Sequence, residues 1–157
     1  MLMERRLASV HRLAFRLLGD AHEAEDVAQE AFLKLWAHAP DWQPGRARLS
    51  TWLHRVASNA CYDRLRKRKP DLPGEALDPE DDRPGAHATL ERAQRWDALQ
   101  AAMMQLDPRQ RTALSLCYDE ALPQREAAAV MEISEKAYES LLVRARRALK
   151  ETVNPHA

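Results

Sequence analysis

The amino-acid sequence predicts an all-α protein, with two small helical domains joined by a flexible acidic linker. Apolar residues recur three and four positions apart in most segments, and no convincing strand-like alternation is present. Residues 70–85 contain four prolines, two glycines and six acidic residues, a composition that cannot build a core. Helix start and stop signals divide the rest of the chain. We therefore expect domains over 1–69 and 91–153, with a linker over 70–90.

The first domain is expected to contain three helices. Gly19 suits the left-handed position after the first helix, and Asp20 can cap the second. Ser50 can cap a long third helix that ends before Pro70. The expected buried stripes are Leu7, Val10, Leu13, Ala14, Leu17 and Leu18, then Ala24, Val27, Ala28, Ala31, Phe32, Leu35 and Trp36, then Trp52, Leu53, Val56, Ala57, Ala60, Cys61 and Leu65. The outward face of the third helix is expected to hold Thr51, His54, Arg55, Ser58, Asn59, Tyr62, Asp63 and Arg66.

The second domain is expected to end in a helix-turn-helix. Asp107 can cap a helix after the first periodic segment, a short helix can run from Pro123 to Met131, and Ser134 can cap a final helix to about Glu151. Two short helices around a tight turn are typical of this DNA-binding motif. The expected apolar positions are Leu90, Ala93, Trp96, Leu99 and Met103, then Ala113, Leu114, Cys117 and Tyr118, then Ala137, Leu141, Ala145, Ala148 and Leu149.

The net charge is zero, with 24 basic and 24 acidic residues, but the charges are arranged in blocks. Residues 46–69 carry eight Lys or Arg against one acid. Such a basic helix can neutralise phosphates and release their counterions, so it favours nucleic-acid binding. The alternative is that its last cations complement the helix dipole. Trp52 lies on the apolar stripe and fits a core role better than base stacking.

The sequence disfavours an enzyme, a cofactor and a membrane-inserted protein. It has only four glycines and no phosphate-binding glycine motif, and its six histidines form no recognisable metal set. No apolar run is long enough to span a bilayer, and the N-terminus lacks a secretory signal. Cys61 and Cys117 lack metal-binding spacing and fit buried thiols in a reducing compartment. We expect a cytoplasmic protein.

Three segments together resemble the extracytoplasmic-function sigma factors of bacterial RNA polymerase. They are LAFRLLGDAHEAEDVAQEAFLKLWAH, STWLHRVASNACYDRLRKRK, and LDPRQRTALSLCYDEALPQREAAAVMEIS followed by LLVRARRAL. They match regions 2 and 4 of the family in order. The resemblance implies three partners: core RNA polymerase, promoter DNA and an anti-sigma protein. It also implies an alternative sigma factor that directs polymerase to particular promoters and melts the −10 element.

The resemblance also implies site residues. The helix over Glu25–Trp36 would dock on the polymerase clamp through Asp26, Gln29, Glu30 and Phe32. The −10 element would be contacted by Arg46, Arg48, Arg55, Asn59, Arg64, Arg66, Lys67 and Arg68, and a flipped base would be captured by Asn59 and the loop around Trp42–Leu49. The −35 element would be read by Lys136, Glu139, Ser140, Arg144 and Arg147.

Three positions depart from the family pattern. Glu132 occupies the turn where a glycine is usual, Pro123 stands where Ser or Thr often caps, and Leu141 stands where an Arg is common. These departures leave the choice of −35-reading side chains open. Residues alone also permit a helix-turn-helix repressor that dimerises through 1–69, or a metal-dependent enzyme acting on nucleic acid. The acidic linker fits either a nucleic-acid mimic or a solubilising spacer.

Overall fold

The structure is a computed structural model that describes residues 2–38, 49–68 and 87–154. Every element in these ranges is helical, which confirms the all-α prediction. Most of the predicted linker, residues 70–86, lies outside the described part of the chain. The elements are α1 (Leu2–Leu18), α2 (Ala21–His38), α3 (Leu49–Lys67), α4 (His87–Met104), α5 (Pro108–Leu114), the π-helical turn η2 (Ser115–Asp119), α6 (Gln124–Met131) and α7 (Glu135–Val153).

Local signals place most helix boundaries where they were predicted. Gly19 has a φ of 71°, the left-handed conformation expected after α1. Three predicted caps accept backbone N–H groups: Asp20 from Glu23 at 3.0 Å, Asp107 from Arg109 at 2.7 Å, and Ser134 from Ala137 at 3.0 Å. Ser50 differs, because α3 already begins at Leu49 and Ser50 therefore lies inside its first turn.

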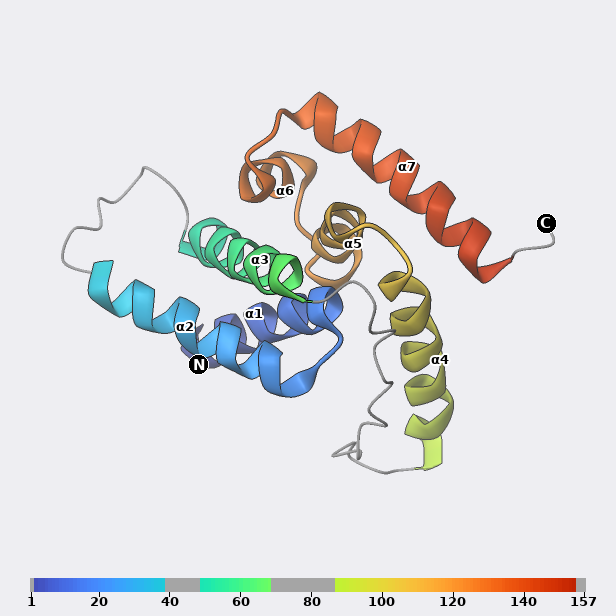
Figure 1. Ribbon diagram of the computed structural model, residues 1–157, viewed down its shortest axis with the longest axis horizontal. Helices are drawn as coiled ribbons and strands as arrows, with labels where there is room; N and C mark the ends of the chain where they lie inside the picture. Colours follow the sequence, from blue (N-terminus) through green and yellow to red (C-terminus); the bar gives the residue numbers. More distant parts are fainter. Residues whose placement is uncertain (1, 39–48, 69–86, 155–157) are drawn as a thin grey trace.

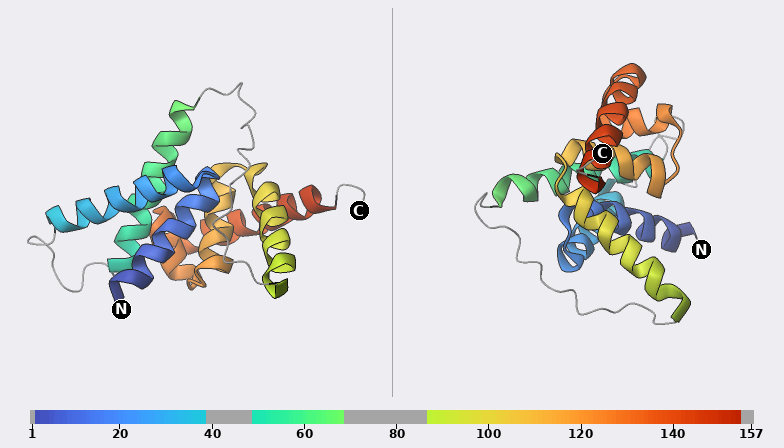
Figure 2. Two further views of the ribbon diagram at one scale, coloured as in Figure 1. Left: turned by 90° about the horizontal axis from the view of Figure 1, so that it is seen from below. Right: turned by 90° about the vertical axis from the view of Figure 1, so that its right-hand side faces the viewer.

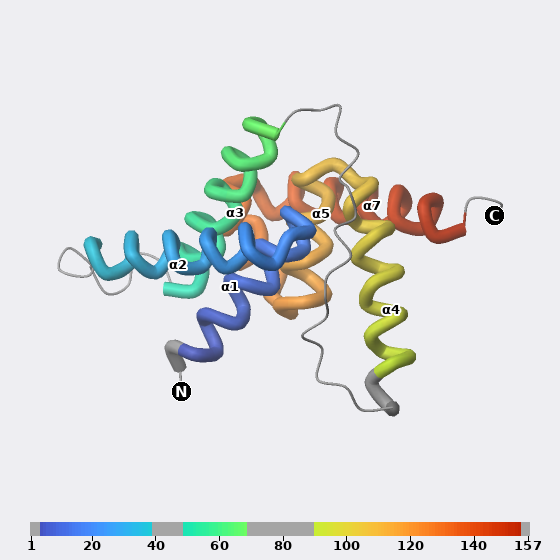
Figure 3. The backbone as a smooth tube through the Cα atoms, turned by 60° about the horizontal axis from the view of Figure 1, so that its bottom comes forward, coloured from blue at the N-terminus to red at the C-terminus, as the bar shows by residue number. Residues whose placement is uncertain are grey.

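Two helical units lie against each other (Figure 1). Helices α1, α2 and α3 pack together as one unit, and α4, α5, η2, α6 and α7 form the other. The units meet where α3 packs on α6 and where α1 touches α4, α5 and η2. Figure 2 and Figure 3 show the same arrangement from other sides, with α4 beside the end of α1 and with α7 at the outer face. One apolar core runs through both units.

The predicted stripe of α2 is only partly buried. Its fully buried residues stop at Ala31, while Phe32 and Leu35 are half-buried and Trp36 is 80% exposed. The C-terminal turns of α2 extend beyond α1 in Figure 1, so the apolar pattern continues past the end of the core. Burial of Trp36 was therefore predicted wrongly. Leu7 was also predicted wrongly, since 44% of it is exposed.

The outward face predicted for α3 was wrong at three positions. Thr51, His54 and Ser58 are buried. The reason is that α3 has neighbours on more than one side, with α1 and α2 on one and α6 on another. His54 contacts Ser9 of α1, and the Ser58 hydroxyl donates to the His54 carbonyl within α3. A stripe drawn from apolar residues alone therefore underestimates the buried width of this helix.

The second unit departs from its predicted stripes in places. Leu90 and Leu99 of α4 are exposed, and so is Tyr118, which lies in η2. A π-helical turn holds one residue more than an α-helical turn, so a strict 3.6-residue period does not continue through it. In α7 the buried residues are Tyr138, Leu142 and Ala145, whereas Ala137 is exposed and Leu141, Ala148 and Leu149 are half-buried.

Candidate nucleic-acid interface

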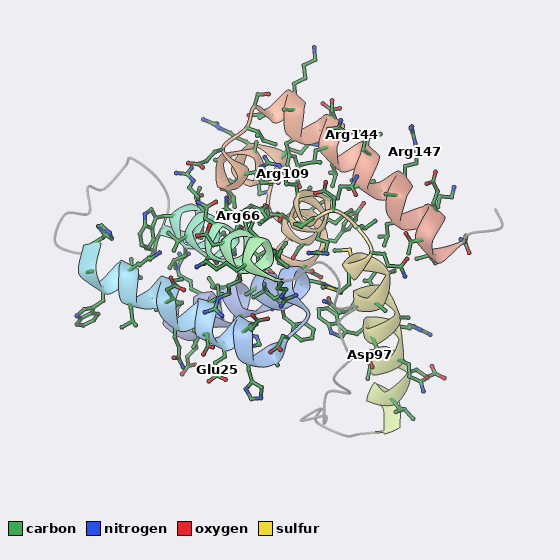
Figure 4. All side chains as sticks on the ribbon, viewed as in Figure 1. Glu25, Arg66, Asp97, Arg109, Arg144 and Arg147 are labelled. Atoms are coloured by element: carbon green, nitrogen blue, oxygen red, sulfur yellow. The ribbon has the colours of Figure 1, made fainter. Side chains whose placement is uncertain are left out.

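The basic helix α3 presents some of its predicted DNA contacts to solvent. Asn59, Arg66 and Lys67 are exposed, and Arg66 also pairs with Asp63 one turn away. Figure 4 shows Arg66 near the C-terminal end of α3. The C-terminal end of α3 therefore offers cations, and about two turns before them the amide of Asn59 can donate to and accept from a base edge.

Two further cations, Arg64 in the last turn of α3 and Arg68 just after it, are partly neutralised by α2. Arg68 pairs with Glu23 and donates to the Leu18 carbonyl at 3.0 Å. Arg64 lies 3.9 Å from the Glu23 carboxylate. Both contacts tie the end of α3 to the start of α2. These two arginines thus have a structural partner as well as the predicted DNA role.

Arg55 is turned toward the second unit. Its Nη2 donates to the Ala129 carbonyl at 2.7 Å, and its Nε lies 3.6 Å from the Glu132 carboxylate. Arg55 therefore connects the predicted −10 helix to the turn of the predicted helix-turn-helix. The other predicted −10 residues, Arg46 and Arg48, and the loop around Trp42 lie outside the described residues.

Helix α7 has the form expected of a recognition helix. All five predicted −35 residues, Lys136, Glu139, Ser140, Arg144 and Arg147, are exposed. Arg144 and Arg147 lie on the outer helix in Figure 4, away from α2. Arg146 is held differently: it donates to the Tyr118 hydroxyl at 2.6 Å, and this hydrogen bond raises the pKa of Arg146.

The departures from the family pattern have visible structural effects. Glu132 adopts φ 58° and ψ 41°, the left-handed conformation that glycine accepts most readily. Pro123 precedes α6 and makes no side-chain capping bond. Leu141 is half-buried against the core, and its aliphatic side chain has no donor or acceptor for a base edge.

The side of α2 that was predicted to bind polymerase also exposes two large apolar residues. Asp26 and Gln29 are exposed, Glu30 pairs with Lys34 at 3.6 Å, and Phe32 is half-buried. Leu33 and Trp36 are 71% and 80% exposed and follow Asp26 and Gln29 along the same side at helical spacing. Trp36 was predicted to lie in the core, whereas Leu33 was assigned to neither face. Leu33 and Trp36 are exposed because both lie beyond Ala31, the last buried residue of α2.

A polar cluster joins the two units and was not predicted. Glu120 accepts two bonds from Arg12, both at 2.7 Å, and also one from the Ser9 hydroxyl. Asp119 accepts from Arg16 at 2.7 Å. The sequence pattern contains no hint of these pairs, because their partners are more than 100 residues apart.

Burial and hydrogen bonding between the units shift the pKa values of several groups. Burial lowers the pKa of His54, whose Nδ1 lies 2.6 Å from the Ser50 carbonyl and whose Nε2 lies 2.7 Å from Ser9 Oγ. The hydrogen bond to Glu120 raises the pKa of Arg12. Burial also raises the pKa of Tyr62, whose hydroxyl lies 2.6 Å from Thr112 Oγ1 in the other unit.

The described residues contain neither a metal-binding cluster nor a membrane-spanning helix. In ranges 2–38, 49–68 and 87–154 no three His, Cys, Asp or Glu side chains are grouped so that they could hold a metal ion. Within the same part of the chain, no helix has the length and apolar character needed to cross a membrane.

Comparison with known proteins decides the family. The profile of sigma-70 region 2 matches residues 2–70, and that of sigma-70 region 4 matches residues 96–149. The ECF RNA polymerase sigma factor SigW of Bacillus subtilis is 30% identical over 159 aligned residues, covering 90% of this chain and 81% of SigW. This chain belongs to the ECF RNA polymerase sigma factors. An ECF sigma factor directs RNA polymerase to promoters for transcription initiation and is a non-catalytic subunit.

Solved structures agree with the ECF sigma fold. CnrH, in complex with the cytosolic domain of CnrY, has a TM-score of 0.72 and 26% identity, covering 99% of this chain and 87% of CnrH. The sigma factor RpoE of Bartonella quintana, in complex with the anti-sigma factor NepR, has a TM-score of 0.70, covering 99% of this chain and 96% of RpoE. At 21% identity the second likeness shows the fold alone. Region 2 corresponds to the α1–α3 unit. The first half of the chain is therefore a sigma-factor region and not the dimerisation domain of a repressor.

Proposed function

We propose that this ECF sigma factor melts the −10 element with α3 and reads the −35 element with α7. The observation that carries the proposal is that region 2 and region 4 each match a separate helical unit, and each unit exposes a cationic helix. The proposed domains are 1–69 and 91–153, joined by a linker over 70–90. The first range would hold the −10 and polymerase contacts, and the last would hold the −35 contacts.

Melting at the −10 element would use binding energy instead of hydrolysis. Unstacking a base step costs a few kcal/mol, which capture of the extruded base and of the single strand can offset. Asn59 is exposed on α3 and would read the captured base together with the loop around Trp42–Leu49. The neighbouring cations Arg64, Arg66, Lys67 and Arg68, with Arg46, Arg48 and Arg55, would hold the strand backbone.

The −35 element would be read as duplex DNA. Lys136, Glu139 and Ser140 lie in the N-terminal half of α7, where recognition helices approach base edges. Arg144 and Arg147 follow on the exposed side and would contact phosphates. The Ser134 cap holds the first turn of this helix in place.

Core RNA polymerase would dock on the exposed side of α2. Asp26, Gln29, Glu30 and Phe32 would contribute, and the exposed Leu33 and Trp36 extend the same surface with apolar area. Trp is among the residues enriched where protein surfaces bind each other. An anti-sigma protein is a further proposed partner, because the similarly folded sigma factor RpoE of Bartonella quintana forms a complex with the anti-sigma factor NepR. This activity places the protein in the cytoplasm.

Run-off transcription with core RNA polymerase tests the proposal. The purified protein should yield promoter-specific transcripts from a genomic template library, and Asn59→Ala should reduce them at least tenfold. Glu151→Gln, an exposed change at the far end of α7, is the matched control and should leave them unaltered. An absence of any promoter-specific transcript would refute the proposed function. Equal loss in Asn59→Ala and Glu151→Gln would refute the role of Asn59.

A further inference from the structure

We propose that a cavity between α1, the start of α3 and the segment that joins η2 to α6 binds a small amphipathic carboxylate. The cavity has a volume of about 260 Å³. The apolar body of the ligand would rest on Val10, Leu53 and Leu122, and its carboxylate would be held by Arg5 and Arg6. The inference goes beyond the proposed function and does not depend on the promoter contacts of α3 and α7.

Three segments supply the apolar part of the wall. Val10 of α1 and Leu53 of α3 are fully buried, and Leu122, between η2 and α6, is half-buried. The volume lies just below the roughly 300–1,000 Å³ of pockets that hold drug-sized ligands. The cavity therefore suits a single ring or a short alkyl chain, whose burial against these side chains would remove apolar surface from water.

The uncharged and acidic groups in the wall already have partners. Ser9 Oγ lies 2.7 Å from His54 Nε2 and donates to Glu120, and His54 Nδ1 lies 2.6 Å from the Ser50 carbonyl. Glu120 is the carboxylate of this lining, and it accepts two bonds from Arg12 at 2.7 Å. Because an arginine neutralises this carboxylate, the cavity does not favour a cationic ligand.

Arg5 and Arg6 bring positive charge to the cavity without such pairing. In the part of the chain that the structure describes, neither arginine forms a salt bridge with a carboxylate. The Nε of Arg6 is buried and has no hydrogen-bond partner there. After burial, the charge of Arg6 also contributes to lowering the pKa of His54 in the same lining. Most buried donors in proteins are satisfied by protein, water or a bound group, so the unpaired Nε favours an acceptor in the cavity.

The charge and the apolar wall together select the class of ligand. Inorganic phosphate would pair with the arginines but would leave the apolar side chains without contacts. A neutral hydrocarbon would cover those side chains but would leave Arg6 Nε unpaired. A carboxylate attached to a ring or short chain satisfies both, because a guanidinium binds a carboxylate through strong charge-assisted hydrogen bonds. Benzoate, with one ring and one carboxylate, is the probe that matches this description.

NMR titration of the full-length, nitrogen-15-labelled protein at physiological salt tests the site. Benzoate should saturate with a dissociation constant in the millimolar range or below. The largest amide shifts should fall in the first half of α1, at the start of α3 and at Leu122. Benzamide has the same shape without the charge, and inorganic phosphate has the charge without the ring. Each should bind at least tenfold more weakly than benzoate, which corresponds to about 1.4 kcal/mol.

Three variants place the ligand in the cavity. Arg6→Gln removes the charge but keeps most of the side chain, and it should weaken benzoate binding at least tenfold. Leu122→Trp should abolish binding by filling the cavity. Arg95→Gln removes an exposed arginine from α4 and is the matched control, which should bind benzoate as the wild type does. The amide spectrum of each variant reports whether it is folded.

Several outcomes would overturn the proposal. One is a failure of benzoate to saturate at concentrations up to tens of millimolar. Another is binding of benzamide or phosphate as tight as that of benzoate, and a third is a set of shifted amides that lies on α7 instead. Equal weakening by Arg6→Gln and Arg95→Gln would also overturn it, since binding would then follow net charge. The comparison of the three ligands uses only the wild type, so it decides the ligand class even where a variant fails to fold.

Discussion

At the scale of single residues, burial sets the pKa of a cysteine thiol, which composition does not reveal. Cys61 is fully buried, as predicted, whereas Cys117 is half-buried. Loss of hydration raises the pKa of the Cys61 thiol to about 12. Both cysteines looked alike in the sequence, since each lies in an apolar periodic segment. They differ in burial only because α3 packs against its neighbours and encloses Cys61.

Cys61 should therefore resist alkylation. At pH 8 iodoacetamide should modify Cys61 in the folded protein about a hundredfold more slowly than in guanidinium-unfolded protein, because little thiolate is present. Mass spectrometry of tryptic peptides measures both cysteines in one sample, with Cys117 as the internal reference. Equal rates for Cys61 in the folded and unfolded protein would contradict this account of its burial.

Glu132 shows how one residue can be strained by its turn. The resemblance to the family placed Glu132 in a turn where a glycine is usual, and its φ of 58° shows that the turn keeps the left-handed conformation. Glu132→Gly should raise the free energy of unfolding by about 1 kcal/mol, because the side chain no longer opposes this conformation. Denaturant unfolding measures the change.

The control is the same Glu-to-Gly substitution at a helical position. Glu135→Gly at the start of α7 should lower the free energy of unfolding by roughly 0.5–1 kcal/mol. A loss of stability in both variants would show that the contact of Glu132 with Arg55 outweighs the strain of the turn.

At the scale of elements, the helices follow from local signals, but their buried faces do not. The caps at Asp20, Asp107 and Ser134 were predicted from short-range chemistry and are present. The buried polar residues on α3 and α1 were missed, because apolar periodicity identifies only one packed face of a helix. His54 contacts Ser9, and Arg16 contacts Asp119. Both partners come from distant parts of the chain and pack on a face of the helix that apolar periodicity does not mark.

Arg16 provides an element-scale prediction. Arg16→Ala should lower the free energy of unfolding by about 3 kcal/mol or more, because Asp119 would lose its buried partner and Trp96 its stacked guanidinium. Arg95→Ala on the exposed side of α4 is the matched control and should change stability by less than about 0.5 kcal/mol. Chemical denaturation followed by circular dichroism compares them. Similar small effects would show that the buried pair contributes little.

At the scale of the whole molecule, a net charge of zero results from surfaces with different proposed partners. Residues 46–69 are strongly basic, and the segment that follows them is strongly acidic. Region 4 also packs against α3, so the second unit covers part of this basic helix. Charge distribution along the sequence predicted the nucleic-acid surface, but it could not show that the chain itself covers part of that surface.

The free protein should therefore bind promoter DNA weakly. At about 150 mM salt, fluorescence anisotropy should show little binding of full-length protein to a duplex promoter that it transcribes with polymerase. Addition of core RNA polymerase should produce a stable complex, because polymerase would add its own contacts to the promoter and to the sigma factor. Lower salt should strengthen the weak binding of the free protein. Tight binding by the free protein at 150 mM salt would contradict this expectation.

The sequence by itself determined the helices, their caps and the family, because these depend on neighbouring residues and on motifs read in order. Gly19, Asp107 and Ser134 act within one turn of their own position. Only the tertiary structure decided that Arg16, His54 and Gln100 are buried and that the units meet through Asp119 and Glu120. A polar side chain can be buried when another part of the chain supplies its hydrogen-bond partner. For Arg16 that partner lies 103 residues away, beyond the reach of any local pattern.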